Sequence, residues 1–199
     1  LKKRFGQSIA LDEVSMHVRD GAMYGFVGPN GAGKTTTIRC MMGLLAADGG
    51  KLLINGIDME KEPKKALSQI GYIPDDFGVY DNLKVLEYME FFASCYGITG
   101  LSARKRSMTL LDQVGLEGKS DFYVDSLSKG MKQRLCLARA LVHNPSILIM
   151  DEPLQGLDAE TKEKVATVIK TQTAGKTVLF VTHDEKEAEF FEAECMELV

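Results

Sequence analysis

Short apolar runs alternate with helical patterns along most of this 199-residue chain. Compact apolar runs predict buried strands at residues 23–27, 146–150 and 177–182, with further short strands at 52–54 and 69–73. Apolar side chains at helical spacing predict helices at residues 35–45, 129–143, 159–171 and 184–193. A looser alternation through residue 18 predicts short antiparallel strands. Repeated strand–helix alternation indicates an α/β fold with a mixed, mainly parallel sheet.

The pattern changes between about residues 81 and 129. Apolar and aromatic residues there predict one helix over residues 83–92 and a second over residues 102–114. We therefore expect a single domain over residues 1–199, in which an α-helical insertion at about 81–129 interrupts an α/β core. The core comprises residues 1–80 and 130–199 and includes the N-terminal antiparallel portion.

Composition narrows the class of protein. Hydrophobic residues make up 45% and charged residues 26%, as in ordinary globular proteins. The formal net charge of −4 argues against a nucleic-acid binder with a basic face. No apolar run approaches the roughly 18 residues of a transmembrane helix, and no signal peptide opens the chain. We expect the cysteines to be reduced and packed as small hydrophobic residues. We also expect the chain to be part of a longer polypeptide, and to reach any membrane only through a partner.

The stretch GPNGAGKTTT, residues 28–37, follows a predicted strand and opens a predicted helix. It satisfies the pattern G-x-x-x-x-G-K-[ST] through Gly28, Gly33, Lys34 and Thr35. Its backbone N–H groups and the helix N-terminus favour phosphate oxygens, and the lysine adds a positive charge. The alternative is a glycine-rich turn that only caps a helix, but the flanking elements favour phosphate binding. The predicted nucleotide-binding residues of this loop are Gly28, Pro29, Asn30, Gly31, Ala32, Gly33, Lys34, Thr35 and Thr36.

Four later segments follow in a fixed order: LSKGMKQRLCLARAL (127–141), ILIMDEP (147–153), LQGLD (154–158) and VTHD (181–184). Together with GPNGAGKTTT, they make the chain resemble the nucleotide-binding domain of ABC transporters over nearly its whole length. The resemblance implies a P-loop NTPase core, the cofactors ATP and Mg²⁺, and a head-to-tail dimer that encloses two ATP molecules.

The resemblance also assigns catalytic and metal-binding roles. It implies that Glu152 polarises the attacking water, that His183 contacts the γ-phosphate, and that Lys34 completes the catalytic set. The implied metal ligands are Thr35, Asp151 and Asp75, whose oxygens suit Mg²⁺. The structural alternatives are a charged pair that closes a strand and a histidine with no function.

Further roles concern the partner subunit and the adenine ring. Ser128 and Gly130 are retained from the family's LSGGQ signature, whereas Lys129 and Met131 depart from it. The resemblance implies that Ser128, Gly130 and Asp158 act in trans on the nucleotide of the other subunit. Phe5 stands where the family places an aromatic that stacks on adenine; the alternative is a core phenylalanine.

Asp75 occupies the position where the family usually has glutamine. Aspartate can also ligate Mg²⁺, but it is shorter by a methylene and carries a charge. We therefore expect metal contact or ATPase coupling to differ from that of a standard family member.

The expected function is ATP binding and hydrolysis that powers transport. The resemblance implies a homodimer or a heterodimer with another ABC ATPase domain, bound to a transmembrane permease on the cytoplasmic side of the membrane. The exporter branch with a separate permease chain is the expected subgroup, and no direct nucleic-acid partner is expected. The alternative is a non-transport ABC ATPase that acts as a mechanical clamp on ribosomes or DNA. A P-loop GTPase or small-molecule kinase is disfavoured, because N-K-x-D is absent and LSKGM would have no role.

Overall fold

The computed structural model describes residues 1–29, 31–75, 78 and 82–197. The chain forms two compact units. The first comprises residues 1–70, 146–152 and 175–199, and the second comprises residues 71–145 and 153–174. Each unit is therefore built from segments that are separated in sequence.

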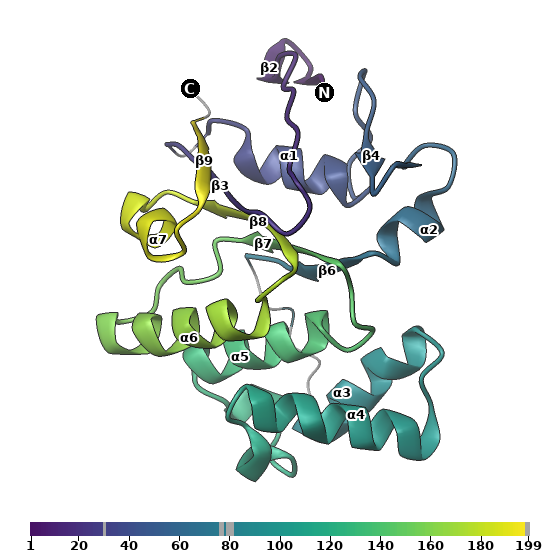
Figure 1. Cartoon of the computed structure of the whole chain (residues 1–199), viewed down its shortest axis with the longest axis vertical. Helices are drawn as coiled ribbons and strands as arrows, with labels where there is room; N and C mark the ends of the chain where they lie inside the picture. Colours follow the sequence, from purple (N-terminus) through teal and green to yellow (C-terminus); the bar gives the residue numbers. More distant parts are fainter. Residues whose placement is uncertain (30, 76–77, 79–81, 198–199) are drawn as a thin grey trace. The chain divides into compact units, whose positions relative to one another are not determined.

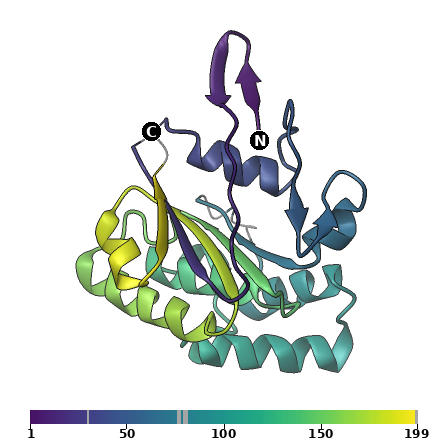
Figure 2. The ribbon, with the colours of Figure 1, turned by 45° about the horizontal axis from the view of Figure 1, so that its top comes forward.

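The first unit is organised by a parallel sheet. Its strands are β3 (Met23–Val27), β7 (Ile147–Asp151), β8 (Thr177–Thr182) and β9 (Glu194–Glu197), in the order β7-β8-β3-β9. All three pairings among them are parallel, and Figures 1 and 2 show these strands running side by side. Phe26 and Phe180, from the adjacent strands β3 and β8, are both fully buried. Apolar side chains thus cover the middle of the sheet, as expected for strands buried on both faces.

Three helices and four short strands complete the first unit. The helix α1 (Lys34–Met41) contacts β7 and β2, while α7 (Glu185–Phe190) contacts β3 and β8. Ile38 of α1 is fully buried, and Phe191 after α7 packs on Phe180 with ring centroids 5.2 Å apart. The remaining elements are β1 (Lys3–Phe5), β2 (Ser8–Leu11), β4 (Leu53–Ile54), β5 (Ile57–Asp58) and α2 (Pro63–Leu67).

The antiparallel hairpin β1–β2 is tied to the loop that follows α1. Lys3 is 9% exposed, and its Nζ donates to the Ala46 carbonyl at 2.6 Å and to Asp48 Oδ1 at 2.9 Å. The backbone N–H of Arg4 donates to Asp48 Oδ2 at 2.7 Å. One carboxylate therefore fixes the strand that carries Phe5.

Asp48→Asn is expected to destabilise the fold slightly at neutral pH. The hydrogen bond from Lys3, and then that from the Arg4 backbone, lower the pKa of the Asp48 carboxyl. Because the pKa of Asp48 is lower in the folded state, its contribution to the free energy of unfolding is complete well above the unfolded pKa of about 3.9. This contribution is lost as pH falls through the folded-state pKa. Thermal unfolding from pH 3 to 7 should show the Asp48→Asn deficit shrinking towards acid pH. The exposed Asp20→Asn is the control, and a pH-independent deficit at Asp48 would contradict this account.

The second unit is mainly helical. Its elements are the 3₁₀ turns η1 (Glu117–Lys119) and η2 (Val124–Ser126) and the helices α3 (Val85–Cys95), α4 (Gly100–Gln113), α5 (Lys129–Ala140) and α6 (Ala159–Gln172). The helices α3, α4 and α5 contact one another, and α6 packs on α5. Tyr88, Leu111 and Leu135 are fully buried in this unit. The strand β6 (Ile70–Ile73) crosses the boundary and is placed next to β7 in the sheet order.

The predicted fold class is confirmed: the chain is α/β with a parallel sheet, an antiparallel N-terminal strand pair and helices at residues 85–113. The strands expected at 23–27 and 177–182 have the predicted bounds. The strands β5 and β9 were not predicted. The prediction of strands beyond Leu11 was wrong, because residues 12–18 alternate between exposed and partly buried positions without joining a sheet.

Among the described residues, every helix is too short or too polar to cross a membrane.

Candidate functional site

Three strands of the first unit end at one edge of the sheet. In the parallel register, Val27 of β3 pairs with Thr182 of β8, and Asp151 of β7 pairs with Val181 of β8. The residues that follow these ends are the glycine loop, Glu152 and His183. Parallel sheets bind ligands beyond the carboxyl ends of their strands. The topology thus gathers three predicted motifs at such an edge.

The loop between β3 and α1 needs glycine. Gly31 and Gly33 have φ values of 91° and 89°, a left-handed region that other residues resist. At Gly33, a Cβ would lie 2.5 Å from the Ala10 carbonyl oxygen and 2.9 Å from Leu11 Cδ2. Both the backbone conformation and the close approach of the hairpin therefore exclude a side chain at residue 33.

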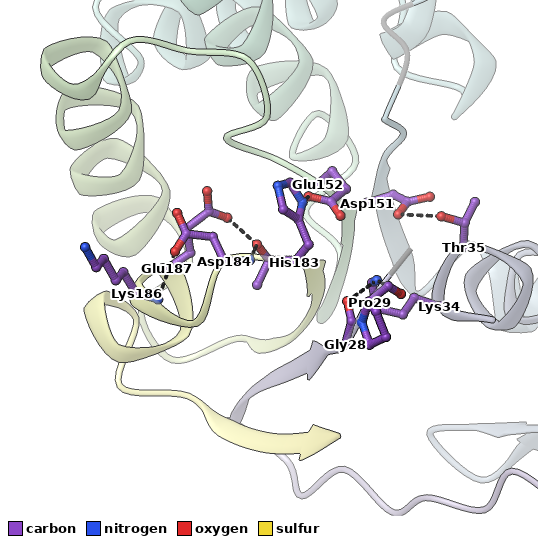
Figure 3. Close-up of polar contacts among 11 residues, drawn as sticks. Gly28, Pro29, Lys34, Thr35, Asp151, Glu152, His183, Asp184, Lys186 and Glu187 are labelled. Atoms are coloured by element: carbon purple, nitrogen blue, oxygen red, sulfur yellow. Dashed lines mark hydrogen bonds and ion pairs between the residues drawn. The ribbon is translucent and has the colours of Figure 1, made fainter. Parts of the chain in front are cut away.

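Lys34 begins α1 and is 6% exposed. Its Nζ donates to the carbonyls of Gly28 at 2.6 Å and Pro29 at 2.9 Å, so its ammonium group lies against the loop, as Figure 3 shows. A cavity of about 170 Å³ adjoins this loop. Its lining residues are Ala10, Gly31, Gly33, Lys34, Thr35, Thr36 and Glu152.

Five residues of the predicted loop thus line the same cavity: Gly31, Gly33, Lys34, Thr35 and Thr36. Ala32 is part of the same turn, where its N–H donates to the Pro29 carbonyl at 3.3 Å. Asn30 lies outside the described residues.

Asp151 ends β7 and is completely buried. Its Oδ1 accepts a hydrogen bond of 3.2 Å from the Thr35 hydroxyl (Figure 3). Two of the three predicted metal ligands are therefore in contact. The described residues contain no cluster of three or more His, Cys, Asp or Glu side chains suited to a metal ion.

Glu152 directly follows β7 in a left-handed conformation with φ of 50°. Its backbone N–H donates to the Val181 carbonyl at 3.0 Å, which ties this conformation to the neighbouring strand. A positive φ at a glutamate costs of order 1 kcal/mol and commonly marks a functional site. The side chain is 10% exposed, and its Oε2 lies 2.9 Å from Nδ1 of His183. Figure 3 shows this pair next to Asp151.

Phe5 lies on β1 and is 53% exposed, so the alternative of a core phenylalanine is not supported. Lys3 Nζ lies 5.6 Å from the centroid of its ring, within the range of a cation–π contact. The exposed Phe5 ring is therefore available for stacking with another ring.

The predicted in-trans residues lie in the second unit. Ser128 caps α5 and accepts the Met131 N–H at 3.3 Å, and Asp158 caps α6 and accepts the Thr161 N–H at 3.0 Å. Hydrogen bonds from Thr161 lower the pKa of the Asp158 carboxyl. Gly130 is buried against α6, where a Cβ would overlap the Thr161 methyl group. Their structural roles as caps and as a close helix contact are therefore established.

The three departures from the family pattern, Lys129, Met131 and Asp75, also fall in the second unit. Lys129 is the first residue of α5, and its Nζ lies directly over Gly156. Asp75 is exposed at a bend that follows β6.

Comparison with known proteins identifies the family. The sequence profile described as "ABC transporter" matches residues 11–155. This chain belongs to the ABC transporter family. The match spans the glycine loop, the α5 segment and Glu152, which are three of the five segments that carried the resemblance.

Similar curated sequences include several that are named as ATP-binding proteins. The linearmycin resistance ATP-binding protein LnrL of Bacillus subtilis is 35% identical over 191 residues, which cover 96% of this chain and 61% of that protein. The probable multidrug ABC transporter ATP-binding protein YbhF of Escherichia coli is 38% identical over 96% of this chain and 33% of its own length. The Nod factor export ATP-binding protein I of Paraburkholderia xenovorans is 38% identical over 95% and 62%. The chain thus spans from 33% to 62% of the length of these relatives.

Solved ABC structures share the fold. A dimeric post-hydrolysis state of the ATP-binding cassette MJ0796, bound to ADP and Pi, superposes with a TM-score of 0.85 at 30% identity, covering 99% of this chain and 90% of that one. An ATP-binding subunit of an ABC transporter gives a TM-score of 0.86 at 30% identity, covering 100% and 83%.

Two residues next to the site of this ABC chain, Thr182 and Glu187, were not predicted from the sequence. Both are almost completely buried, and they contact each other behind His183. The spacing of Asp184 and Glu187 matches a helix capping box, a signal that was available in the sequence.

Proposed function

We propose that this chain binds ATP and hydrolyses it to ADP and phosphate. One observation carries the proposal: Lys34 and Glu152 line the same hollow, and Glu152 is held by His183 at 2.9 Å. Phosphoryl transfer requires a cradle for the phosphates, positive charge and an oriented nucleophile, rather than covalent chemistry from the protein. Residues 28–36 supply the cradle, and Phe5 offers a surface for adenine.

Glu152 orients the attacking water in this proposal. A carboxylate on a side chain that is 10% exposed, paired with one imidazole nitrogen, has a restricted direction, which favours one water position. His183, with its side chain half exposed, is placed to contact the γ-phosphate while Nδ1 faces Glu152. Lys34 neutralises charge on the β- and γ-phosphates.

Mg²⁺ fits the oxygen donors of this site. Mg²⁺ is usually held by one or two carboxylates together with phosphate and water oxygens. The Thr35 hydroxyl and the Asp151 carboxylate, 3.2 Å apart, would hold it. The ion supplies charge neutralisation at the phosphates when bound.

We propose that Asp75 either binds the same Mg²⁺ ion or takes part in coupling ATP hydrolysis to the permease. If it replaces the usual glutamine as a ligand, Asp75→Gln should change the Mg²⁺ concentration for half-maximal ATPase activity by about threefold or more. Exposed Asp112→Asn, also in the second unit, is the control. Identical rates and Mg²⁺ dependence in Asp75→Gln and the unaltered chain would contradict this assignment.

A second subunit completes each site in this proposal. Ser128 and Gly130, at the start of α5, and Asp158, at the start of α6, act on the nucleotide of the partner, which is an identical chain or another ABC ATPase domain. The dimeric state of MJ0796 supports this arrangement. All 199 residues then act as one ABC ATPase domain, with residues 81–129 as its helical insertion.

Transport is the proposed use of the hydrolysis. The similar proteins include a probable multidrug transporter protein and a Nod factor export protein, which support an exporter with a separate transmembrane permease. The chain would then lie on the cytoplasmic side of the membrane through that permease, without a nucleic-acid partner. Copurification should recover a polytopic membrane protein; recovery of ribosomes or DNA instead would favour a mechanical clamp.

Phosphate release from MgATP by the purified chain tests the enzymatic proposal. We expect saturable hydrolysis that stops when EDTA removes Mg²⁺ and that falls to background in Lys34→Ala. Hydrolysis no faster than that of Lys34→Ala would overturn it.

A further inference from the structure

The end of β8 is connected to the start of α7 through one buried hydroxyl. Thr182 is 0% exposed and Glu187 is 6% exposed. The Thr182 hydroxyl donates to Glu187 Oε2 at 2.7 Å and accepts the backbone N–H of Asp184 at 3.0 Å. It is thus used both as a donor and as an acceptor within six residues of chain.

This arrangement is a capping box with an added link. Asp184 is the N-cap of α7 and accepts the Lys186 N–H at 3.1 Å, while Glu187 is the third helical residue. In an ordinary capping box, the third residue accepts the N–H of the cap directly. Here the Thr182 hydroxyl stands between the Asp184 N–H and the Glu187 carboxylate. The strand end, the cap and the helix therefore form one hydrogen-bonded unit.

His183 lies in the middle of this unit. Its two chain neighbours, Thr182 and Asp184, are hydrogen bonded to each other, whereas its own side chain is half exposed. An exposed ring has few packing contacts to set its direction, so the backbone on either side largely determines where Nδ1 points. That nitrogen lies 2.9 Å from Glu152 Oε2, and Figure 3 shows Glu187 and Asp184 on one side of His183 and Glu152 on the other.

We propose that Glu187 is a positioning residue for hydrolysis, which holds His183 towards Glu152 through the Thr182 hydroxyl. The proposal rests on the proposed ATPase function. A carboxylate is costly to bury unless it receives strong hydrogen bonds, and a bond from a hydroxyl to an ionised carboxylate is among the stronger ones. The alternative is a purely structural role, in which Glu187 only stabilises α7.

A double-mutant cycle separates these two roles. In the otherwise unaltered chain, Glu187→Met should lower kcat by about tenfold to a hundredfold, the effect of small misplacements in active sites, with KM changed by less than about twofold. In a His183→Ala background, the same substitution should lower kcat by less than about twofold. Equal losses in the two backgrounds, or an unchanged kcat, would overturn the proposal.

Exposed Glu189→Met is the matched control, because it makes the same change in the same helix. It should leave kcat within about twofold of the unaltered chain. A comparable loss in Glu189→Met would show that altering α7 alone is sufficient, and would also overturn the proposal.

Thr182 supplies a second test if Glu187→Met does not fold. Thr182→Ser keeps the hydroxyl and should retain activity, whereas Thr182→Val removes it and should reproduce the kcat loss. NMR of the His183 ring in the chain without nucleotide should show shifted resonances in Thr182→Val but not in Thr182→Ser. Equal spectra and rates in the two variants would refute the proposal. Failure of the unaltered chain to hydrolyse ATP would refute the ATPase function, while the ring resonances would still decide the positioning role.

Discussion

Glu152→Gln is expected to lower the rate of ATP hydrolysis by about a hundredfold to ten-thousandfold, the usual contribution of a positioned general base. The amide keeps the size of the side chain and an oxygen that can face His183, but it loses the charge that orients and polarises water. Because Glu152 contacts the hollow without forming the glycine loop, ATP affinity should change by less than about threefold.

The measurement combines steady-state phosphate release with sedimentation velocity. We further propose that the subunits separate once ADP and phosphate have been released, so Glu152→Gln with MgATP should sediment as a dimer and the unaltered chain should not. Exposed Glu189→Gln, which also removes one carboxylate, serves as the control. Near-normal turnover in Glu152→Gln, or a monomer under all conditions, would contradict the proposed catalytic role or the proposed dimer.

Gly33→Ala is expected to weaken ATP binding by about a hundredfold or more. The added Cβ would lie 2.5 Å from the Ala10 carbonyl oxygen, a backbone atom that cannot rotate away, and φ is already 89°. Relief requires the loop or the hairpin to move, which would disrupt the cradle of N–H groups around the phosphates. Such a loss in affinity corresponds to about 2.7 kcal/mol.

Titration with a fluorescent ATP analogue measures this effect. Gly21→Ala is a sharp control, because Gly21 has a similar left-handed φ of 74° but no atom within 4 Å of its Cβ position. It isolates the cost of the backbone conformation, roughly 1 kcal/mol, from the collision. If both variants bind ATP as the unaltered chain does, the close approach of the hairpin is irrelevant to binding.

Much of the sheet was predictable because its central strands are continuous apolar runs. The strands at residues 23–27 and 177–182 contain no charged side chain, so their bounds were found directly. The phosphate loop was equally clear, since its glycines meet conformational demands that are local to the sequence. Parallel pairing then brings Asp151 and Thr35 together without further information.

Other features depend on contacts that no local pattern contains. The strand β9 has the sequence ECME and is stable only because β3 offers it an edge. Residues 12–18 alternate as a strand would, yet they join no sheet within the described part of the chain. Likewise, Glu187 looks like a solvated helix residue in the sequence, yet it is 6% exposed and accepts a hydrogen bond from the buried Thr182 hydroxyl.

The division of the chain has a consequence for protein engineering. The polypeptide passes from one unit to the other at residues 70/71, 145/146, 152/153 and 174/175. Neither unit can therefore be excised as a single uninterrupted fragment, and ending the chain at residue 145 or at residue 152 removes strands or helices from both. Many contacts join residues far apart along the chain, so folding should be slow relative to that of a helical bundle. Because β8 lies between β3 and β7, the central strands of the sheet can pair only after β8 has been synthesised.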